Sequence, residues 1–208
     1  LHPRVRRQRQ MCIRDSPKVG MQTSNNEKFL RLWWETDWSP TQNDSNHKWI
    51  KYLKGGKYRK WNGNLEYLLF YNNDPNYILE QPHARVLPLE MLRKPKITCT
   101  MLTSGRPGFR SAPEDSFYDI AAHCCFPKEP QFNYILGLLN SSLSALCLSA
   151  QNPTMNMQVS DIASVPYVEG DPKSVSKVSG IVAESSDISK IDWDSFETSW
   201  DFKRHPLL

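Results

Sequence analysis

Gln131–Ala150, with the sequence QFNYILGLLNSSLSALCLSA, gives the clearest helical signal in this chain. Residues three and four apart lie on the same face of an α-helix. At that spacing the segment forms one apolar stripe of Phe132, Ile135, Leu136, Leu139, Leu143, Leu146 and Cys147. Asn152-Pro153 comes next, and a residue before proline disfavours helical conformation. The sequence therefore predicts one amphipathic helix over about 131–150, packed under a sheet.

The segments before this helix favour short strands. Their apolar and aromatic character is typical of strands, which we expect within 29–34, 65–71, 97–102 and 116–126. Gly55-Gly56 is expected to turn a hairpin between two further strands. Strands and helices do not alternate regularly. The sequence therefore predicts an α+β fold with an irregular mixed or antiparallel sheet and one prominent helix.

The length of 208 residues fits one domain with tails. Residues 1–16 are basic and unlike the rest of the chain, so we expect a non-native, adapter-derived tail; a natural basic tail is the alternative. One folded domain is expected over 17–168. A linker containing Gly, Pro and Ser is expected over 169–179. The acidic and aromatic residues of 180–208 would begin a truncated C-terminal region.

Composition restricts the classes of function. The net charge is only +4, so a nucleic-acid-binding role needs a local basic patch. The five cysteines are an odd number without CxxC spacing, which favours reduced thiols and a cytoplasmic location. No run of eighteen apolar residues is present, so we expect no membrane span.

Residues 48–61, KWIKYLKGGKYRKW, carry the strongest functional signal. The segment contains no acid, and its cations are Lys48, Lys51, Lys54, Lys57, Arg59 and Lys60. Its interleaved aromatic residues are Trp49, Tyr52, Tyr58 and Trp61. Cations neutralise phosphates, aromatic rings stack on bases, and glycines let a backbone approach closely. The pattern indicates nucleic-acid binding; the alternative is a solvated hairpin whose lysines only keep it soluble.

A second candidate contact loop is Thr103–Arg110, TSGRPGFR. Arg106 and Arg110 could each place a guanidinium fork on guanine or on a phosphate, with Ser104 beside them. The alternative is a surface loop whose arginines pair with nearby acids.

The chain offers no convincing catalytic, cofactor-binding or metal-binding set. Asp74-Pro-Asn-Tyr77 is close to the Asp-Pro-Pro-aromatic loop of amino-group methyltransferases, but its third residue is Asn and no glycine-rich loop precedes it. We expect a turn there. Adjacent cysteines on a strand point to opposite faces, so His123-Cys124-Cys125 is not expected to hold zinc.

Four segments in order resemble the PglX family, the adenine-specific DNA methyltransferases of BREX phage-defence systems. They are residues 20–29, 54–64, 152–159 and 192–207. The resemblance covers about 17–208 and matches the C-terminal part of the family. That part is similar to the target-recognition domains of type II restriction-modification enzymes.

The resemblance implies a parent enzyme that transfers a methyl group from S-adenosylmethionine to adenine N6. The catalytic domain is expected to be missing from this chain, so no catalytic or cofactor-binding residue carries over and the fragment would be non-catalytic. Expected partners are double-stranded DNA, the N-terminal catalytic domain of the same polypeptide and other phage-defence proteins. A non-enzymatic specificity subunit of a type I restriction system is the alternative, although it normally has two recognition domains separated by long helices.

The resemblance also divides the labour between the two candidate segments. The residues expected to hold the DNA backbone are Lys48, Lys51, Lys54, Gly55, Gly56, Lys57, Tyr58, Arg59, Lys60 and Trp61. The residues expected to read base edges are Ser104, Arg106 and Arg110.

Overall fold

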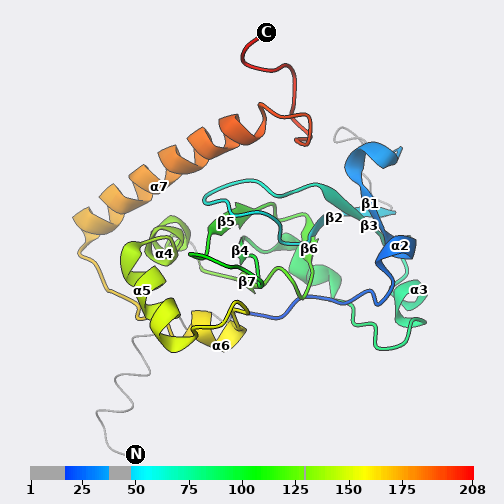
Figure 1. The fold of residues 1–208 in the computed structure, drawn as a ribbon, viewed down its shortest axis with the longest axis horizontal. Coiled ribbons are helices and arrows are strands. Elements are labelled where there is room, and N and C mark those ends of the chain that lie inside the picture. Colours follow the sequence, from blue (N-terminus) through cyan, green and yellow to red (C-terminus); the bar gives the residue numbers. More distant parts are fainter. Residues whose placement is uncertain (1–16, 38–47, 129) are drawn as a thin grey trace, which may run out of the picture.

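The computed structural model describes residues 17–37, 48–128 and 130–208. The predicted adapter-derived tail, residues 1–16, lies outside the described residues. Within them, the fold is α+β, as predicted, but its strands form two open sheets rather than one (Figure 1).

The larger sheet has the strand order β1-β3-β2-β6. Its strands are β1 (Leu30–Leu32), β2 (Trp49–Leu53), β3 (Tyr67–Phe70) and β6 (Ser116–Tyr118). β2 and β6 run parallel, whereas the other neighbours run antiparallel. The smaller sheet is antiparallel and has the order β5-β4-β7. It contains β4 (Lys96–Cys99), β5 (Phe109–Ala112) and β7 (Cys124–Cys125).

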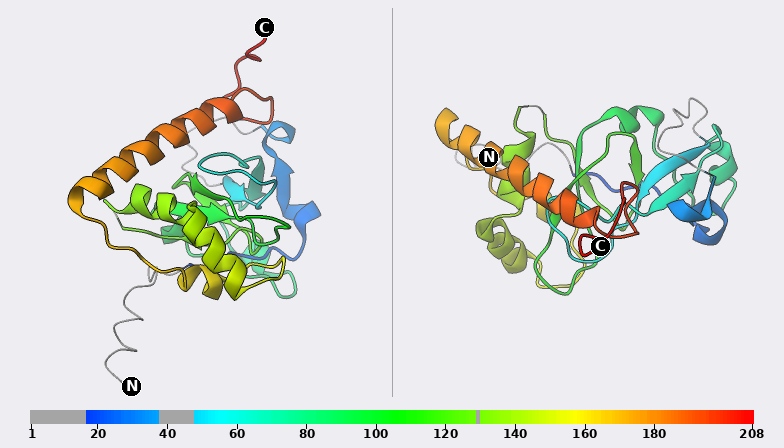
Figure 2. Two further views of the ribbon diagram at one scale, coloured as in Figure 1. Left: turned by 60° about the vertical axis from the view of Figure 1, so that its left-hand side comes forward. Right: turned by 90° about the horizontal axis from the view of Figure 1, so that it is seen from above.

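Helices lie at both ends of this arrangement. They are α2 (Asn26–Phe29), α3 (Asn76–Leu79), α4 (Phe132–Leu139), α5 (Ser142–Gln151), α6 (Val159–Ala163) and α7 (Pro172–Trp193). Two 3-10 turns occur at Trp33–Glu35 and Leu89–Arg93. Figures 1 and 2 show α7 starting beside α4 and α5 and running along the outside of the molecule toward the C-terminal segment.

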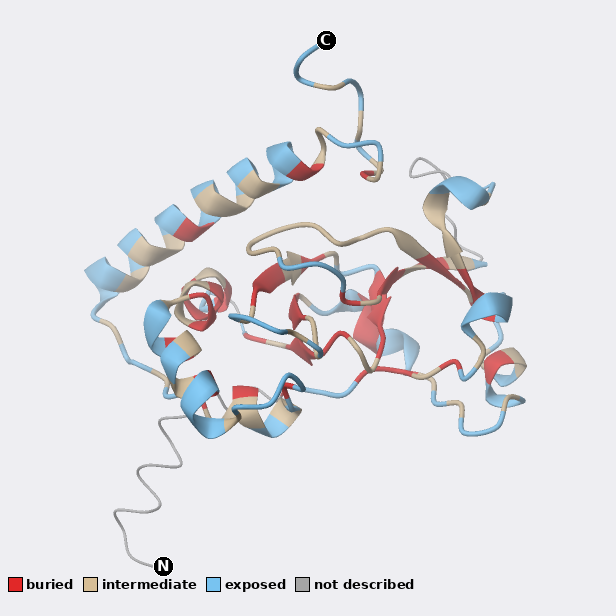
Figure 3. Cartoon of the chain, viewed as in Figure 1, coloured by how far each residue is buried: buried red, intermediate tan, exposed pale blue. Residues whose placement is uncertain are grey.

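The apolar core has two clusters, and buried residues gather on the sheets and α4 (Figure 3). One cluster lies against the larger sheet and includes Phe29, Leu69 and Phe117. The other joins the smaller sheet to the helices through Phe109 and Leu136. Within the described residues, no single helix is long and apolar enough to cross a membrane; only α4 and α5 together have that length and composition, and they are bent by 60°.

The predicted single helix over 131–150 is wrong in its second half. The chain breaks after α4 at Asn140, and Ser141 caps α5 by accepting a hydrogen bond from Ser144 N at 3.2 Å. The first half of the predicted stripe is buried, but in α5 Leu143 and Leu146 are exposed by 49% and 67%. The bend turns the second half of the stripe out of the core. The predicted stop at Asn152-Pro153 is confirmed, because α5 ends at Gln151.

The predicted position of the hairpin turn at Gly55-Gly56 is also wrong. Both glycines have positive φ, 88° and 121°, but the antiparallel pair β2 and β3 is connected by the whole of residues 54–66, so Gly55-Gly56 lies at the start of a long loop and forms no tight turn between them. Gly55 is required by a close approach, since a Cβ there would lie 2.9 Å from the carbonyl oxygen of Ala121. The predicted strand within 116–126 is likewise divided between β6 and β7, which belong to different sheets.

Part of the predicted linker is helical. Asp171 caps α7 by accepting hydrogen bonds from Lys173 N and Ser174 N, and Pro172 occupies the first turn. A Ser-rich composition therefore hid a capped helix of 22 residues. The segment after α7 packs back on the domain, where the Trp200 indole donates to the carbonyl of Leu65. The division of the chain into a domain ending at 168 and a separate C-terminal region stays a prediction.

Candidate nucleic-acid interface

The two segments singled out in the sequence face each other across one cavity of about 470 Å³. We call this cavity the central cleft. It is lined by Gly56, Lys57 and Tyr58 on one side, by Ser104 and Arg106 on the other, and by Arg110. Thr100 connects the two sides at the base, since its hydroxyl donates to the Gly56 carbonyl at 3.1 Å. Side chains separated by about fifty residues therefore share one surface.

The C-terminal end of the basic segment, at Trp61, pairs with β5 through a single β-bridge. Trp61 forms a parallel bridge with Arg110, and Trp61 N donates to Phe109 O at 2.9 Å. Gly108 makes the close approach possible, because a Cβ there would lie 2.3 Å from the Arg59 carbonyl oxygen. The basic segment is consequently held by the smaller sheet.

Lys54 is a structural cation. Its ammonium lies 2.8 Å from the Asp119 carboxylate, whose side chain is only 6% exposed. The Tyr52 hydroxyl donates to the same carboxylate oxygen at 2.8 Å. Burial, followed by the Asp119 charge and this hydrogen bond, raises the pKa of Tyr52 well above its usual value. This buried triad fixes the end of β2 rather than offering a charge to a ligand.

Further cations of the segment also have partners inside the fold. Arg59 pairs with Asp192 of α7, and its guanidinium lies 5.0 Å from the centroid of the Trp193 ring. The Lys60 ammonium donates to Asn140 O at 2.9 Å. These contacts fasten the basic segment to α7 and to the break between α4 and α5.

The two cations of β2 and its entry are paired as well. Lys51 lies 2.8 Å from Asp115, and Lys48 lies 3.5 Å from Asp37. Lys57 differs: its side chain is exposed, and no hydrogen bond or ion pair joins its ammonium to the described residues. It acts on Glu66 only by its charge, which lowers the pKa of that carboxyl while burial raises it more strongly. Lys57 and the neighbouring Tyr58, 59% exposed, are therefore the accessible tip of the segment.

The second segment divides in the same way. Ser104 and Arg106 are exposed, as expected of a contact loop. The expectation of an exposed position fails for Arg110, which lies on β5 and is 1% exposed. Its guanidinium donates to the Arg59 and Gly108 carbonyls and to the Thr100 hydroxyl at 3.3, 3.5 and 3.3 Å. Burial lowers the pKa of Arg110. Arg110 therefore lies at the bottom of the central cleft and cannot reach out to a base edge.

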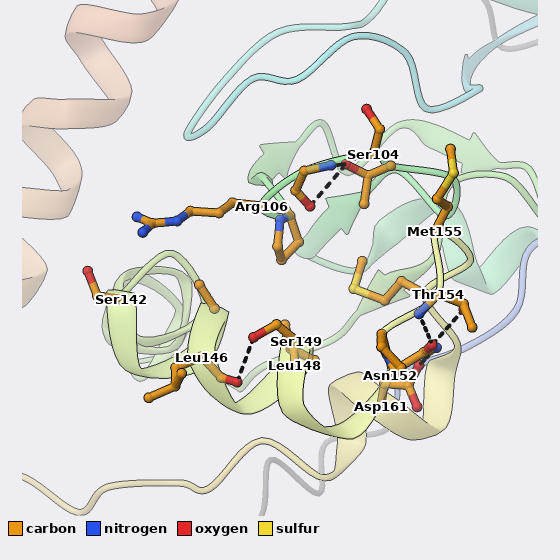
Figure 4. A pocket seen from close by; sticks show the side chains of 16 residues that line it. Ser104, Arg106, Ser142, Leu146, Leu148, Ser149, Asn152, Thr154, Met155 and Asp161 are labelled. Atoms are coloured by element: carbon orange, nitrogen blue, oxygen red, sulfur yellow. Dashed lines mark hydrogen bonds between the residues drawn. The ribbon is translucent and has the colours of Figure 1, made fainter.

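The loop carrying Ser104 and Arg106 has a second cavity of about 420 Å³ on its far side, against α5 and the 152–157 segment. Figure 4 shows the Arg106 side chain extending away from the loop over the end of α5 that carries Ser142. Gly105 at the tip meets no heavy atom within 4 Å of a Cβ placed there. The loop therefore projects between two hollows and presents its tip to solvent.

The residues weighed for catalysis do not gather at this surface. Asp74 accepts a hydrogen bond from Asn76 N at 2.9 Å and starts the short α3, which is the predicted turn. Burial raises the pKa of Cys99 and Cys124 to about 12. Within the described residues, no group of three potential metal ligands occurs.

Sequence reasoning missed the residues that hold the interface in place. Asp119, Asn140 and Asp192 each bind a cation of the basic segment, and Thr100 connects its two sides. All lie far from their partners in the sequence and carry no motif.

The comparisons with known proteins agree on one group of enzymes. The adenine-specific methyltransferase PglX of Lacticaseibacillus casei (strain Zhang) is 27% identical over 93% of this chain and 17% of its own length. The adenine-specific methyltransferase BrxX of Escherichia coli O9:H4 (strain HS) is 29% identical over 91% of this chain and 16% of its own length. No family model matches the chain. The predicted resemblance to PglX-type methyltransferases is confirmed, and the chain spans about a sixth of the length of these relatives.

Among solved structures of similar fold is the type IIL restriction-modification enzyme MmeI, determined in complex with DNA, with a TM-score of 0.57 and 9% identity. The match covers 90% of this chain and 29% of MmeI. At this identity the likeness concerns the fold alone, and it agrees with the predicted restriction-modification type of architecture.

Proposed function

We propose that this chain is a DNA target-recognition module of a site-specific adenine-N6 DNA methyltransferase of the BREX type. The main support for this proposal is that the two predicted contact segments line the same central cleft. Four of their residues are exposed around it: Lys57, Tyr58, Ser104 and Arg106. Cations at such a surface neutralise DNA phosphates, and an arginine on a projecting loop can fork onto guanine.

We assign some residues of the cleft to contacts with DNA and others to holding the surface in place. Lys57 and Tyr58 would contact the DNA backbone, and Ser104 and Arg106 would approach the base edges. Lys54, Arg59 and Lys60, with their partners inside the fold, would support this surface rather than carry phosphates. Methyl transfer from S-adenosylmethionine would take place in a catalytic domain elsewhere in the parent protein, with DNA shared between the two parts. A cytoplasmic location and further phage-defence partners stay predictions.

The test measures the affinity of the Lys57→Gln/Arg106→Gln double variant for duplex DNA. Fluorescence anisotropy reports binding at each of a range of salt concentrations. Removing the phosphate-directed Lys57 should weaken binding and reduce the slope of log affinity against log salt by about 1, and removing Arg106 should weaken binding further by taking away a contact to the base edges. Arg93→Gln/Lys94→Gln is the matched control, because both residues are exposed and neither lines the cleft. Equal losses of affinity in the two variants would contradict the proposed interface.

S-adenosylmethionine provides a second test of the proposal. Calorimetry with the isolated chain should give no binding heat, whereas a clear saturable titration would contradict the placement of the cofactor site outside this chain.

A further inference from the structure

The buried charge of Arg110 is the feature that the fold by itself leaves unexplained. Arg110 is 1% exposed, yet within the described residues it forms no ion pair with a carboxylate. The titratable groups that act on it are the thiols of Cys99 and Cys124 and the guanidinium of Arg59. Both thiols stay neutral at pH 7, because burial raises their pKa to about 12. A buried cation without a counter-charge is costly, so the site favours an anion.

The guanidinium also keeps hydrogen-bonding capacity. Arginine has five N–H donors, and the three acceptors that Arg110 reaches are neutral and lie at 3.3 to 3.5 Å. Its Nε finds no acceptor among the described residues. Long bonds to neutral oxygens leave room for the shorter, charge-assisted bonds that an oxyanion would make.

The position of Arg110 determines where an anion could enter. Arg110 lies at the bottom of the central cleft, and the exposed Ser104 adds a hydroxyl to its lining. Lys57 and Arg106 stand at the rim and add two exposed cations. Among the described residues, no carboxylate lines this cleft. A volume of about 470 Å³ exceeds what one phosphate group requires, so the attached sugars of a nucleic-acid backbone also fit.

We propose that the central cleft is a phosphate-binding site in which Arg110 neutralises one phosphate group, with Lys57 at the rim. The shared chemistry is a tetrahedral phosphate, which could come from a DNA backbone or from free phosphate. The DNA source rests on the proposed function, since the rim residues are the same exposed cations. Arg110 then binds a single phosphate and sets the register of the duplex, whereas base reading belongs to the loop tip.

The first experiment locates the site in the unaltered 208-residue chain. Inorganic phosphate is titrated while backbone amide resonances are followed by NMR, with equal ionic strength maintained by chloride. Saturable shifts centred on Gly56, Ser104 and Gly108 support the site. Absence of saturable shifts there, or shifts centred elsewhere, overturns it, and this result does not depend on a variant that has to fold.

The second experiment separates the two sources of phosphate. Duplex DNA is scanned with single neutral methylphosphonate linkages, and binding is compared between the chain and Arg110→Lys, which keeps the charge but loses the fork. One position should cost the chain about ten- to hundredfold in affinity, as expected for charge-assisted hydrogen bonds. The same position should cost Arg110→Lys clearly less, which a purely structural role of Arg110 would not produce.

The outcomes distinguish this inference from the proposed function. Duplex binding with the same methylphosphonate profile in both proteins overturns the phosphate site but leaves the DNA-binding module intact. Phosphate binding at the cleft without duplex binding supports the site with free phosphate as its ligand, and removes the proposed function.

Discussion

Asn140→Ala is expected to be among the most destabilising single substitutions in this fold. The Asn140 side chain lies at the break between α4 and α5 and is 7% exposed. Its Oδ1 accepts from Phe109 N at 3.0 Å, and its Nδ2 donates to Phe109 O at 2.9 Å. These two bonds join the helical side of the domain to β5. Phe109 is fully buried, so water cannot replace them.

The expected loss of stability can be worked out from these two hydrogen bonds. Phe109 N–H would lose its side-chain acceptor, and a buried donor left unpaired costs about 1–3 kcal/mol. Phe109 O would keep the bond from Trp61 N, so only one of its two bonds is lost, worth about 1 kcal/mol. The free energy of unfolding should fall by roughly 2–4 kcal/mol. For a chain of this size that corresponds to a fall in Tm of roughly 4–16 °C.

The assay is urea unfolding followed by tryptophan fluorescence and circular dichroism, with Asn133→Ala as the matched control. Asn133 lies on α4, is half-buried and makes no side-chain hydrogen bond to the residues that the structure describes, so its replacement should change stability by less than about 0.5 kcal/mol. A loss in Asn140→Ala no larger than in the control would refute the reasoning.

Asn140→Asp supplies a pH-dependent version of the same test. The carboxylate could still accept from Phe109 N–H but would oppose Phe109 O, so burial should raise its pKa in the folded state. A raised folded pKa means that the folded state binds the proton more tightly. Relative to the unaltered chain, the variant should therefore be most stable at acidic pH and lose stability as pH rises above the unfolded pKa.

Three further outcomes are expected. Lys54→Gln should lower the free energy of unfolding by about 1–3 kcal/mol, because it leaves a buried carboxylate without its cation. Lys57→Gln should instead weaken DNA binding without a measurable change in urea unfolding. The reverse pattern would contradict the assignment of these two roles. Leu136→Ala should cost about 2–5 kcal/mol and Leu146→Ala less than about 0.5, since only the first is buried; equal unfolding energies would favour a straight helix. Burial raises the pKa of Cys99 to about 12, so iodoacetamide should modify its thiol only after unfolding. If mass spectrometry finds Cys99 alkylated in protein that was treated while folded, its burial is contradicted.

Features that depend on near neighbours could be read from the sequence. The apolar stripe of α4 is buried as its spacing predicts, and β1, β3 and β6 lie within the predicted aromatic and apolar segments, whereas β5 lies partly in the segment predicted to be a loop. The stop at Asn152-Pro153 results from a local steric rule. The exposure of Ser104 and Arg106 agrees with a loop rich in Gly and Pro.

Features that depend on distant partners could not be read in this way. The apolar spacing of the helix continues in the sequence beyond residue 139, but Asn140 is drawn to Phe109, 31 residues away, and the helix bends there. The linker composition hides α7, which is stabilised by Asp171 at its start and by packing of Val182 on Gly137.

The basic segment shows both what its own sequence could predict and what only distant partners decided. Its composition, cations without acids and interleaved aromatic rings, was sufficient to predict a contact surface. Which cations face solvent was decided by carboxylates from remote parts of the chain, Asp119 for Lys54 and Asp192 for Arg59, 65 and 133 residues away. A charge near the interior is stable only with a partner, and partners at such separations are brought together by packing alone. The tertiary structure therefore left Lys57 accessible and placed it with the buried Arg110 in the lining of one cleft, although all six cations of the segment look alike in sequence.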